Sequence, residues 1–134
     1  MDHFTLDPRL AADTVWVADW ALSTVRLMDD SRFPWVVLIP RRAHVHELHE
    51  LSHGEALVLL QEMQRASRGL QQLFGPDKIN IGALGNIVPQ LHVHVVARRQ
   101  DDAAWPGPVW GRAGGIPYSP EGRQAIISSL VTGL

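Results

Sequence analysis

The stretch QLHVHVV at positions 90–96 constrains this chain more than any other, because polar and apolar residues alternate along it. A period of two is typical of a half-buried strand. It places Gln90, His92 and His94 on one face and the aliphatic residues between them on the other. The aliphatic face predicts attachment to a core, and the polar face presents two imidazoles and an amide to one shared space.

Three interpretations of this polar face are open on spacing alone. One imidazole could attack an electrophile while its neighbours bind the flanking oxygens. A His-x-His pair on a strand could also supply half of a metal site, or the face could simply be solvated. The use of histidine in chemistry near neutral pH favours the first interpretation.

A second group of histidines lies between positions 44 and 53. His44, His46, His49 and His53 stand close to two glutamates, and such a set could bind a divalent ion. The segment has no clean period, however, and His53 falls inside a helix-capping pattern. Loop residues of this kind vary readily, so an exposed polar loop is the favoured interpretation.

Composition excludes several classes of protein. The 134 residues, 46% of them apolar and 19% charged, fit one globular domain over positions 1–134. No run of about 18 apolar residues is present, so no membrane-spanning helix is expected. A net charge of −2 gives no overall field for nucleic acid or anionic membranes. The chain has no cysteine, and its acidic N-terminal segment, residues 1–5, lacks a signal-peptide pattern, so we expect a cytoplasmic protein.

The remaining pattern predicts one long helix among strands. Ser52 and Glu55 match a capping box, and Gly75-Pro76 ends the periodic segment that follows. The residues expected on the core face of this helix are Ala56, Leu60, Met63, Ser67, Leu70 and Phe74. Strands are expected over 14–20, 22–28, 35–39, 78–83 and 91–98, with the run 35–39 buried on both faces.

Proline signals mark both ends of the chain. Asp7-Pro8 is typical of a turn, whereas Ser119-Pro120 predicts the start of a short C-terminal helix with an apolar face that extends to Val131. Strands around one long helix indicate an α+β domain with a mostly antiparallel sheet.

The segment that follows the histidine stretch leaves two questions open. Arg98 and Arg99 could contact phosphate or form a solvated strand end. The proline- and glycine-rich segment 100–115 predicts an ordered loop. Its tryptophans, Trp105 and Trp110, could line a cleft, contact another subunit or pack on the core.

The stretch GNIVPQLHVHVV at positions 85–96 resembles the signature of the histidine triad (HIT) superfamily, in which three histidines alternate with apolar residues. Gln90 stands in the place of the first histidine, and the other signature positions match. Further similarities to family patterns lie in VVLIPRR at 36–42, in Asn80 followed by Gly82, and in Trp105-Pro106-Gly107. The resemblance covers about residues 22–107.

This resemblance implies an activity and a mechanism. It implies hydrolysis or transfer at the α-phosphate of a nucleotide conjugate, either a dinucleoside polyphosphate or a nucleoside phosphoramidate, through a nucleotidyl-histidine intermediate. Carried over to this chain, His92 is the nucleophile and His94 hydrogen-bonds the phosphate oxygens. Gln90 then lies beside the leaving group.

The resemblance also implies a binding pocket and an assembly. Asn80, Gly85 and Asn86 are expected around the phosphate, and Leu27, Met28 and Asp29 near the base and ribose. No cofactor and no resident metal is implied, although a divalent ion could accompany the nucleotide. A homodimer is expected, with the long helix and Trp105 near the contact.

Two departures from the family pattern keep other functions open. The amide of Gln90 cannot donate a proton as an imidazolium can, and Trp35 stands where the family strand often begins with a histidine. A non-catalytic nucleotide-binding or sensing module is therefore a second hypothesis. A metal-binding protein that uses His92, His94 and the histidines of segment 44–53 is a third.

Overall fold

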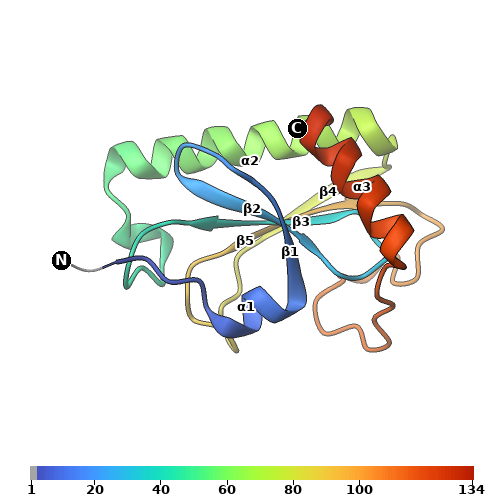
Figure 1. Ribbon diagram of the computed structural model, residues 1–134, viewed down its shortest axis with the longest axis horizontal. Coiled ribbons are helices and arrows are strands. Elements are labelled where there is room, and N and C mark those ends of the chain that lie inside the picture. The colour runs from blue at the N-terminus through green and yellow to red at the C-terminus, as the bar shows by residue number, and fades with distance from the viewer. Residues whose placement is uncertain (1–2) are drawn as a thin grey trace.

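Five antiparallel strands form the centre of the computed structural model, which describes residues 3–134 (Figure 1). The strands are β1 (Thr14–Asp19), β2 (Ser23–Met28), β3 (Trp35–Pro40), β4 (Lys78–Gly82) and β5 (Val93–Arg98), and their order in the sheet is β1-β2-β3-β5-β4. This confirms the predicted α+β class and the antiparallel sheet. Met1 and Asp2, which belong to the N-terminal segment considered above, lie outside the described residues.

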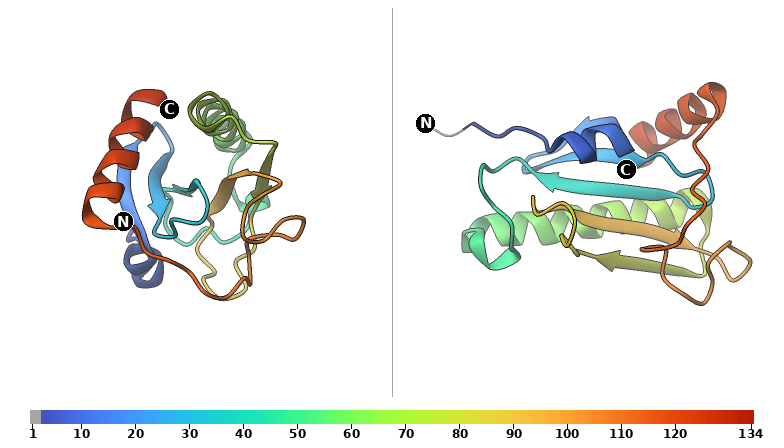
Figure 2. Two further views of the ribbon diagram at one scale, coloured as in Figure 1. Left: turned by 90° about the vertical axis from the view of Figure 1, so that its right-hand side faces the viewer. Right: turned by 90° about the horizontal axis from the view of Figure 1, so that it is seen from below.

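Helices and loops cover both faces of the sheet. The long helix α2 (His53–Phe74) and the C-terminal helix α3 (Pro120–Gly133) lie on one face, as the end-on view in Figure 2 shows. On the other face, Leu10 of the short helix α1 (Pro8–Asp13) packs with Ala104 and Val109 of the loop after β5. No helix in the described part of the chain is long and apolar enough to cross a membrane.

The predicted alternation of the histidine stretch is present in this two-sided sheet. Leu91, Val93 and Val95 join the core on the side of α2, whereas Val96 joins the core on the opposite side. All six residues of β3 are buried, as expected for a strand covered on both faces. His94 is therefore held by an interior strand of the sheet, and His92 lies immediately before that strand.

Two predicted element boundaries were wrong. β5 begins at Val93 rather than residue 91, because its pairing with β3 ends at Leu38 opposite Val93 and the Leu91 N–H donates instead to the Val45 carbonyl at 3.0 Å. Asp7-Pro8 starts helix α1 instead of a turn, and the Asp7 side chain accepts the Arg9 N–H. Only Leu10 of this helix is buried, so the segment carries no apolar period to predict it.

The predicted boundaries of the long helix are confirmed, but its predicted core face is only partly right. The Ser52–Glu55 capping box and the left-handed Gly75 at the C-terminal end are both present. The buried residues of α2 are Leu59, Glu62, Ala66, Gly69 and Leu70, while Leu60 is 48% exposed. On α3, Leu130 is buried as expected, but Val131 is 55% exposed.

A buried glutamate, Glu62, explains why the buried face of α2 differs from the predicted one. The two carboxyl oxygens of Glu62 accept the backbone N–H groups of Leu22 at 2.9 Å and Ser23 at 3.1 Å, where β2 begins. Buried backbone donors need partners, so this contact fixes α2 against the β1–β2 connection. An apolar period cannot reveal a charged residue that faces inward.

We predict that Glu62→Ala destabilises the protein by about 3 kcal/mol, because two buried N–H groups lose their acceptors at roughly 1–3 kcal/mol each. Glu62→Gln is the matched control and should lose less, since its single amide oxygen still accepts one of the two N–H groups. Urea unfolding followed by circular dichroism measures both variants. A Glu62→Ala protein as stable as the wild type would show that this contact does not hold the helix.

Candidate functional site

A cavity of about 510 Å³ contains both His92 and His94 in its lining. Its walls are contributed by α1, by the ends of β2 and β3, by the loop after β4 and by the loop after β5. The apolar and aromatic part of the lining consists of Leu10, Met28, Trp35, Leu84, Ile87, Val88 and Trp110. A mostly apolar cavity with a few convergent polar groups is typical of a small-molecule site.

His92 lies immediately before β5 and is held in one tautomer. Its Nδ1 lies 2.7 Å from the backbone oxygen of Gln90. A carbonyl oxygen only accepts hydrogen bonds, so Nδ1 must carry the proton. In a neutral ring Nε2 then has a free lone pair, and His92 can act as a nucleophile or an acceptor.

His94 is held in the opposite tautomer. The indole N–H of Trp35 donates to its Nδ1 at 3.0 Å, and an indole nitrogen is a donor only. In a neutral ring the proton of His94 is therefore on Nε2. Burial, and then the charge of His92, lower the pKa of His94 to about 4, so the ring stays neutral at pH 7.

Aromatic rings fix the position of His94. Its ring packs edge-on against His92 with a centroid distance of 4.9 Å, against Trp35 at 5.5 Å and against Trp110 at 5.7 Å. The two histidines therefore stand side by side with different chemistry: His92 offers a lone pair, and His94 offers an N–H donor that keeps its proton.

Glycines shape the wall of the cavity at two positions. Gly82 of β4 lies under the ring of Trp110, and a Cβ atom at Gly82 would stand 2.8 Å from the ring carbon Cη2. Gly85 has a φ of +78°, a left-handed conformation that favours glycine. Gly85 and Asn86, both predicted to contact phosphate, line the same cavity as the histidines.

Other predicted binding residues lie elsewhere. Leu27 is completely buried in the core on the α2 side, whereas Met28, expected with it near the nucleoside, does line the cavity. Asp29 accepts the backbone N–H of Tyr118 at 2.9 Å and lines a neighbouring cavity. The structure thus does not bring Leu27 or Asp29 to the histidine pair.

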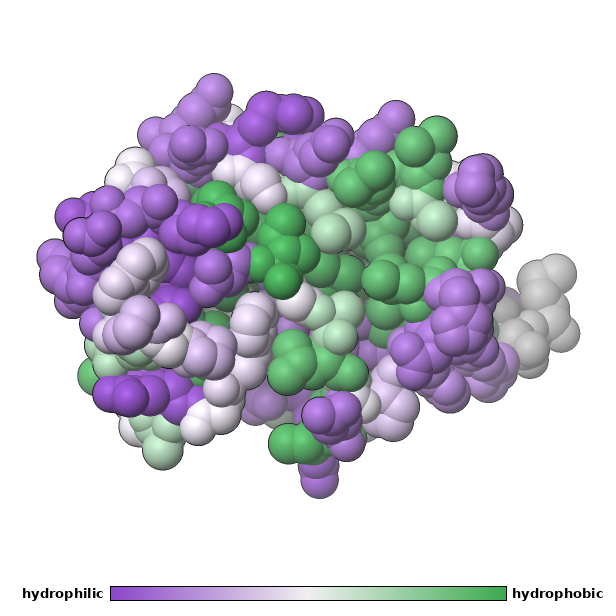
Figure 3. Space-filling model, turned by 180° about the vertical axis from the view of Figure 1, so that it is seen from behind, coloured by the Kyte–Doolittle hydropathy of each residue, from purple (hydrophilic) through white to green (hydrophobic). Residues whose placement is uncertain are grey.

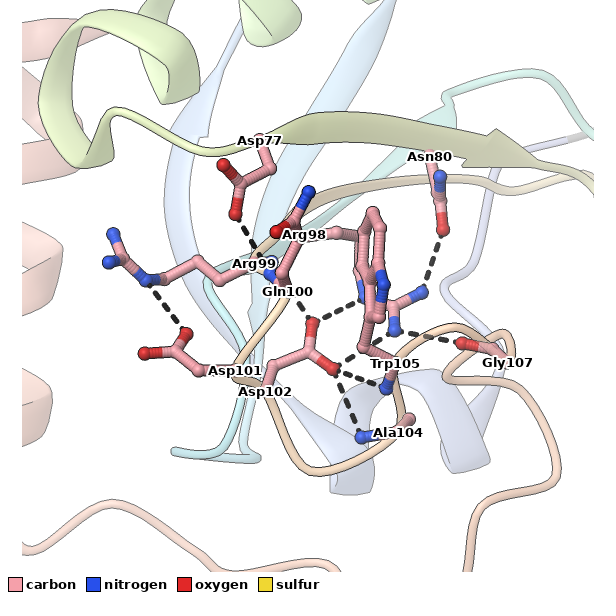
Figure 4. A network of polar contacts seen from close by, with 10 residues as sticks. All are labelled: Asp77, Asn80, Arg98, Arg99, Gln100, Asp101, Asp102, Ala104, Trp105 and Gly107. Atoms are coloured by element: carbon pink, nitrogen blue, oxygen red, sulfur yellow. Dashed lines mark hydrogen bonds and ion pairs between the residues drawn. The ribbon is translucent and has the colours of Figure 1, made fainter.

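Asn80 belongs to a buried network around Arg98 (Figure 4). The Arg98 guanidinium donates to Asn80 Oδ1 at 2.8 Å, to the Gly107 carbonyl at 2.8 Å and to both carboxyl oxygens of Asp102 at 2.7 and 3.0 Å. It also lies 5.7 Å from the ring centroid of Trp105. Asn80 is not part of the cavity lining.

This network corrects both sequence interpretations for Arg98, which is 1% exposed and is neither a solvated strand end nor a free phosphate ligand. Arg99, which is exposed just after β5 and pairs with Asp101, fits the solvated strand end. Burial raises the pKa of Asp102, but hydrogen bonds from Arg98 and from backbone N–H groups outweigh this effect and hold it well below its ordinary value. The network fixes the loop after β5, which carries Trp110 to the cavity.

Gln90 turns away from the histidine cavity. Its side-chain oxygen accepts the backbone N–H of Asp7 at 2.9 Å, and its amide donates to the Thr5 carbonyl at 2.9 Å. Gln90 lies before the start of β5, so the strand geometry that was expected to align it with His92 and His94 does not extend to it. Its side chain holds the N-terminal segment against the loop before β5.

The site includes two residues that the sequence did not assign to it, Trp35 and Val88. Met28 and Trp110 also line the cavity, as expected for a residue near the nucleoside and for a tryptophan in a cleft. In the sequence, Trp35 is the first residue of a buried strand and a departure from a family pattern. Its contact with His94 depends on the pairing of β3 with β5, which the sequence does not give. No three metal-ligating residues form a group within residues 3–134.

The family model of the HIT domain matches residues 9–101, which is more than half of the chain. The chain belongs to the HIT domain family. Membership of this family suggests nucleotide binding together with hydrolase or transferase activity. The match covers β1 to β5, including both histidines of the cavity.

Solved structures of bacterial HIT proteins share the fold over nearly their whole length. A histidine triad protein of Marinobacter aquaeolei VT8 is 44% identical, with a TM-score of 0.97 over 99% of this chain and 97% of that one. A histidine triad protein of Bradyrhizobium japonicum is 42% identical, with a TM-score of 0.96 over 98% of both chains. One from Sinorhizobium meliloti 1021 is 44% identical, with a TM-score of 0.95 over 98% and 97%. No curated protein matches the chain.

We predict that protonation of His94 destabilises this HIT domain as the pH falls. The folded pKa of about 4 lies below the ordinary value of 6.5, so the unfolded chain binds this proton more tightly. The stability contribution is constant above about pH 6.5 and is lost as the pH falls toward 4, by about 3 kcal/mol. The variant His94→Gln has no imidazole at this position and therefore lacks this pH-dependent contribution to stability.

Urea unfolding of the wild type and His94→Gln at pH 7 and pH 4 measures the effect. The carboxylates contribute equally to both proteins, so the difference between them isolates His94. The wild type should lose about 3 kcal/mol more than the variant between the two pH values. An equal loss in both proteins would contradict the assigned pKa.

Proposed function

We propose that this protein is a nucleotide hydrolase or nucleotidyl transferase that acts at the α-phosphate of a nucleotide conjugate through a covalent intermediate on His92. The opposite tautomers of His92 and His94 in one apolar cavity carry this proposal. A lone pair beside a fixed donor is the arrangement needed to attack phosphorus and to stabilise the charge on its oxygens. Family membership supports the same class of activity.

The first step forms a bond between His92 Nε2 and phosphorus. The bond from phosphorus to the leaving group breaks, and the leaving group departs with its electron pair. The resulting imidazolium keeps its proton on Nδ1, and this N–H donates to the Gln90 carbonyl, which stabilises the positive ring. His94 donates its Nε2–H to a phosphoryl oxygen as negative charge develops there.

The second step returns His92 to its starting state. Water attacks phosphorus, the N–P bond breaks, and the electron pair of that bond returns to Nε2. The mononucleotide and one proton are released. Phosphoryl-type transfer depends mainly on positioning and charge stabilisation, which this rigid pair provides. A divalent ion that neutralises a polyphosphate could enter with the substrate, and the apolar walls around Met28 and Val88 suit the nucleoside.

We predict that the protein forms a nucleotidyl adduct on His92. Incubation with an adenylated substrate followed by an acid-free quench and intact-mass spectrometry should show one added AMP, which peptide mapping places on His92. His92→Ala should abolish the adduct and lower turnover by at least about 1000-fold. His53→Ala removes a distant imidazole at the start of α2 and should behave as the wild type.

Two results would oppose this proposal. An adduct on another residue, or full turnover by His92→Ala, would reject the assigned nucleophile. Saturable nucleotide binding without adduct or turnover would support a non-catalytic binding module instead. Gln90 favours this second candidate: it stands where a third imidazole would be, and its side chain bonds to Asp7 and Thr5 instead of entering the histidine cavity.

We also propose that the protein is a homodimer. β4 is an edge strand with an unpaired side, and exposed apolar residues include Leu57 and Leu60 on α2 and Ile81 on β4. Figure 3, which shows the molecule from behind, has apolar side chains gathered over the middle and right of the visible surface. An open strand edge beside exposed aliphatic side chains is suited to pairing with a second copy.

We predict that light scattering at micromolar concentration gives twice the chain mass of 14.9 kDa. Leu60→Glu should shift the protein toward the monomer, because a charge in an apolar contact is costly to bury. Val131→Glu, at an exposed position on α3, is the matched control and should leave the mass unchanged. A wild-type monomer at this concentration would contradict the proposal.

A further inference from the structure

A second cavity adjoins the first at His92. It has a volume of about 270 Å³, and it shares Leu84, Gly85 and His92 with the larger cavity. His46 and His49 also line it, as does Gln90. His92 therefore lies where two cavities meet, and two of the four histidines of segment 44–53 face the smaller one.

Hydrogen bonds hold this histidine-bearing segment in place. It includes the short 3-10 helix η1 (Leu48–Glu50). One carboxyl oxygen of Glu50 accepts the backbone N–H groups of His46 at 3.0 Å and Glu47 at 2.8 Å. The Leu91 N–H donates to the Val45 carbonyl at 3.0 Å, which ties the segment to the residue next to His92. The two imidazoles are thus carried by a folded loop attached to the nucleophile's own stretch.

The cavities differ in the groups that they offer. The larger one is mainly apolar and aromatic, whereas the smaller one has His46 and His49 in its lining. Gln90 also borders it, although the side chain of Gln90 is bonded to Thr5 and Asp7. Among the lining residues Glu47 is the single carboxylate. Two imidazoles, each with an N–H donor, in one small space suit the oxygens of a phosphate group.

A substrate cleaved at phosphorus has two parts, and both must be held near Nε2 of the nucleophile. In an in-line displacement the leaving group departs on the side of phosphorus opposite the attacking atom. A cavity that holds only the nucleoside offers no partners to this second part. The smaller cavity, which also borders His92, is a separate space beside the nucleophile.

We propose that the smaller cavity is the leaving-group subsite, that His46 and His49 bind a phosphate of the leaving group, and that the substrates are therefore phosphoanhydrides rather than phosphoramidates. This inference rests on the proposed function. The anhydride P–O bond breaks, the leaving phosphate oxygen keeps the electron pair, and it departs as an anion stabilised by N–H donors. No proton from Gln90 is required, because a phosphate is a stable anion.

The double variant His46→Ala/His49→Ala tests this proposal with two substrates. Diadenosine triphosphate carries a phosphate in its leaving group, whereas the p-nitrophenyl ester of AMP does not. The variant should lower the ratio of kcat/KM for the triphosphate to that for the ester by about tenfold or more, since a lost charge-assisted hydrogen bond has this effect. His53→Ala should keep the wild-type ratio.

The adduct separates failure of this inference from failure of the proposed function. If AMP still appears on His92 from both substrates but the ratio is unchanged in the double variant, the leaving-group assignment is overturned and the proposed function stands. Faster wild-type turnover of an AMP phosphoramidate than of the triphosphate would also overturn it. If the wild type forms no adduct from either substrate, the proposed function itself fails.

Discussion

The hydrogen bond from the Trp35 indole to His94 Nδ1 is the interaction on which the chemistry of this site depends. Because the indole can only donate, it decides which nitrogen of His94 holds the proton. Burial then keeps that ring neutral, with a pKa of about 4. A histidine that does not ionise cannot repel a developing imidazolium next to it, so the neighbouring His92 can become positively charged during reaction.

The register of the sheet makes this hydrogen bond possible. β3 pairs with β5 so that Val37 stands opposite His94, which places Trp35 two residues further along the same face. On the other side of β5, Gly82 pairs with His94 and leaves room for the ring of Trp110. The two strands that flank β5 therefore both shape the surroundings of His94. β3 supplies Trp35, and Gly82 of β4 leaves the space that the ring of Trp110 fills.

Sequence patterns predicted what depends on neighbours along the chain and missed what depends on distant partners. Alternation placed both histidines on one face, and the capping box at Ser52 gave the start of the long helix. The inward Glu62, the buried Arg98 and the diverted Gln90 each bond to residues far away in sequence. A polar residue whose partner is distant resembles a surface residue in the sequence, so no local period could reveal its role.

The most direct test of this account is the protonation state of the two imidazoles, measured by ¹⁵N NMR of histidine-labelled protein at pH 7. Long-range ¹H–¹⁵N correlations distinguish the Nδ1–H tautomer from the Nε2–H tautomer and from the charged ring. We predict a neutral His94 protonated on Nε2 and a neutral form of His92 protonated on Nδ1. A charged His94, or the same tautomer at both residues, would contradict the arrangement on which the proposed chemistry rests.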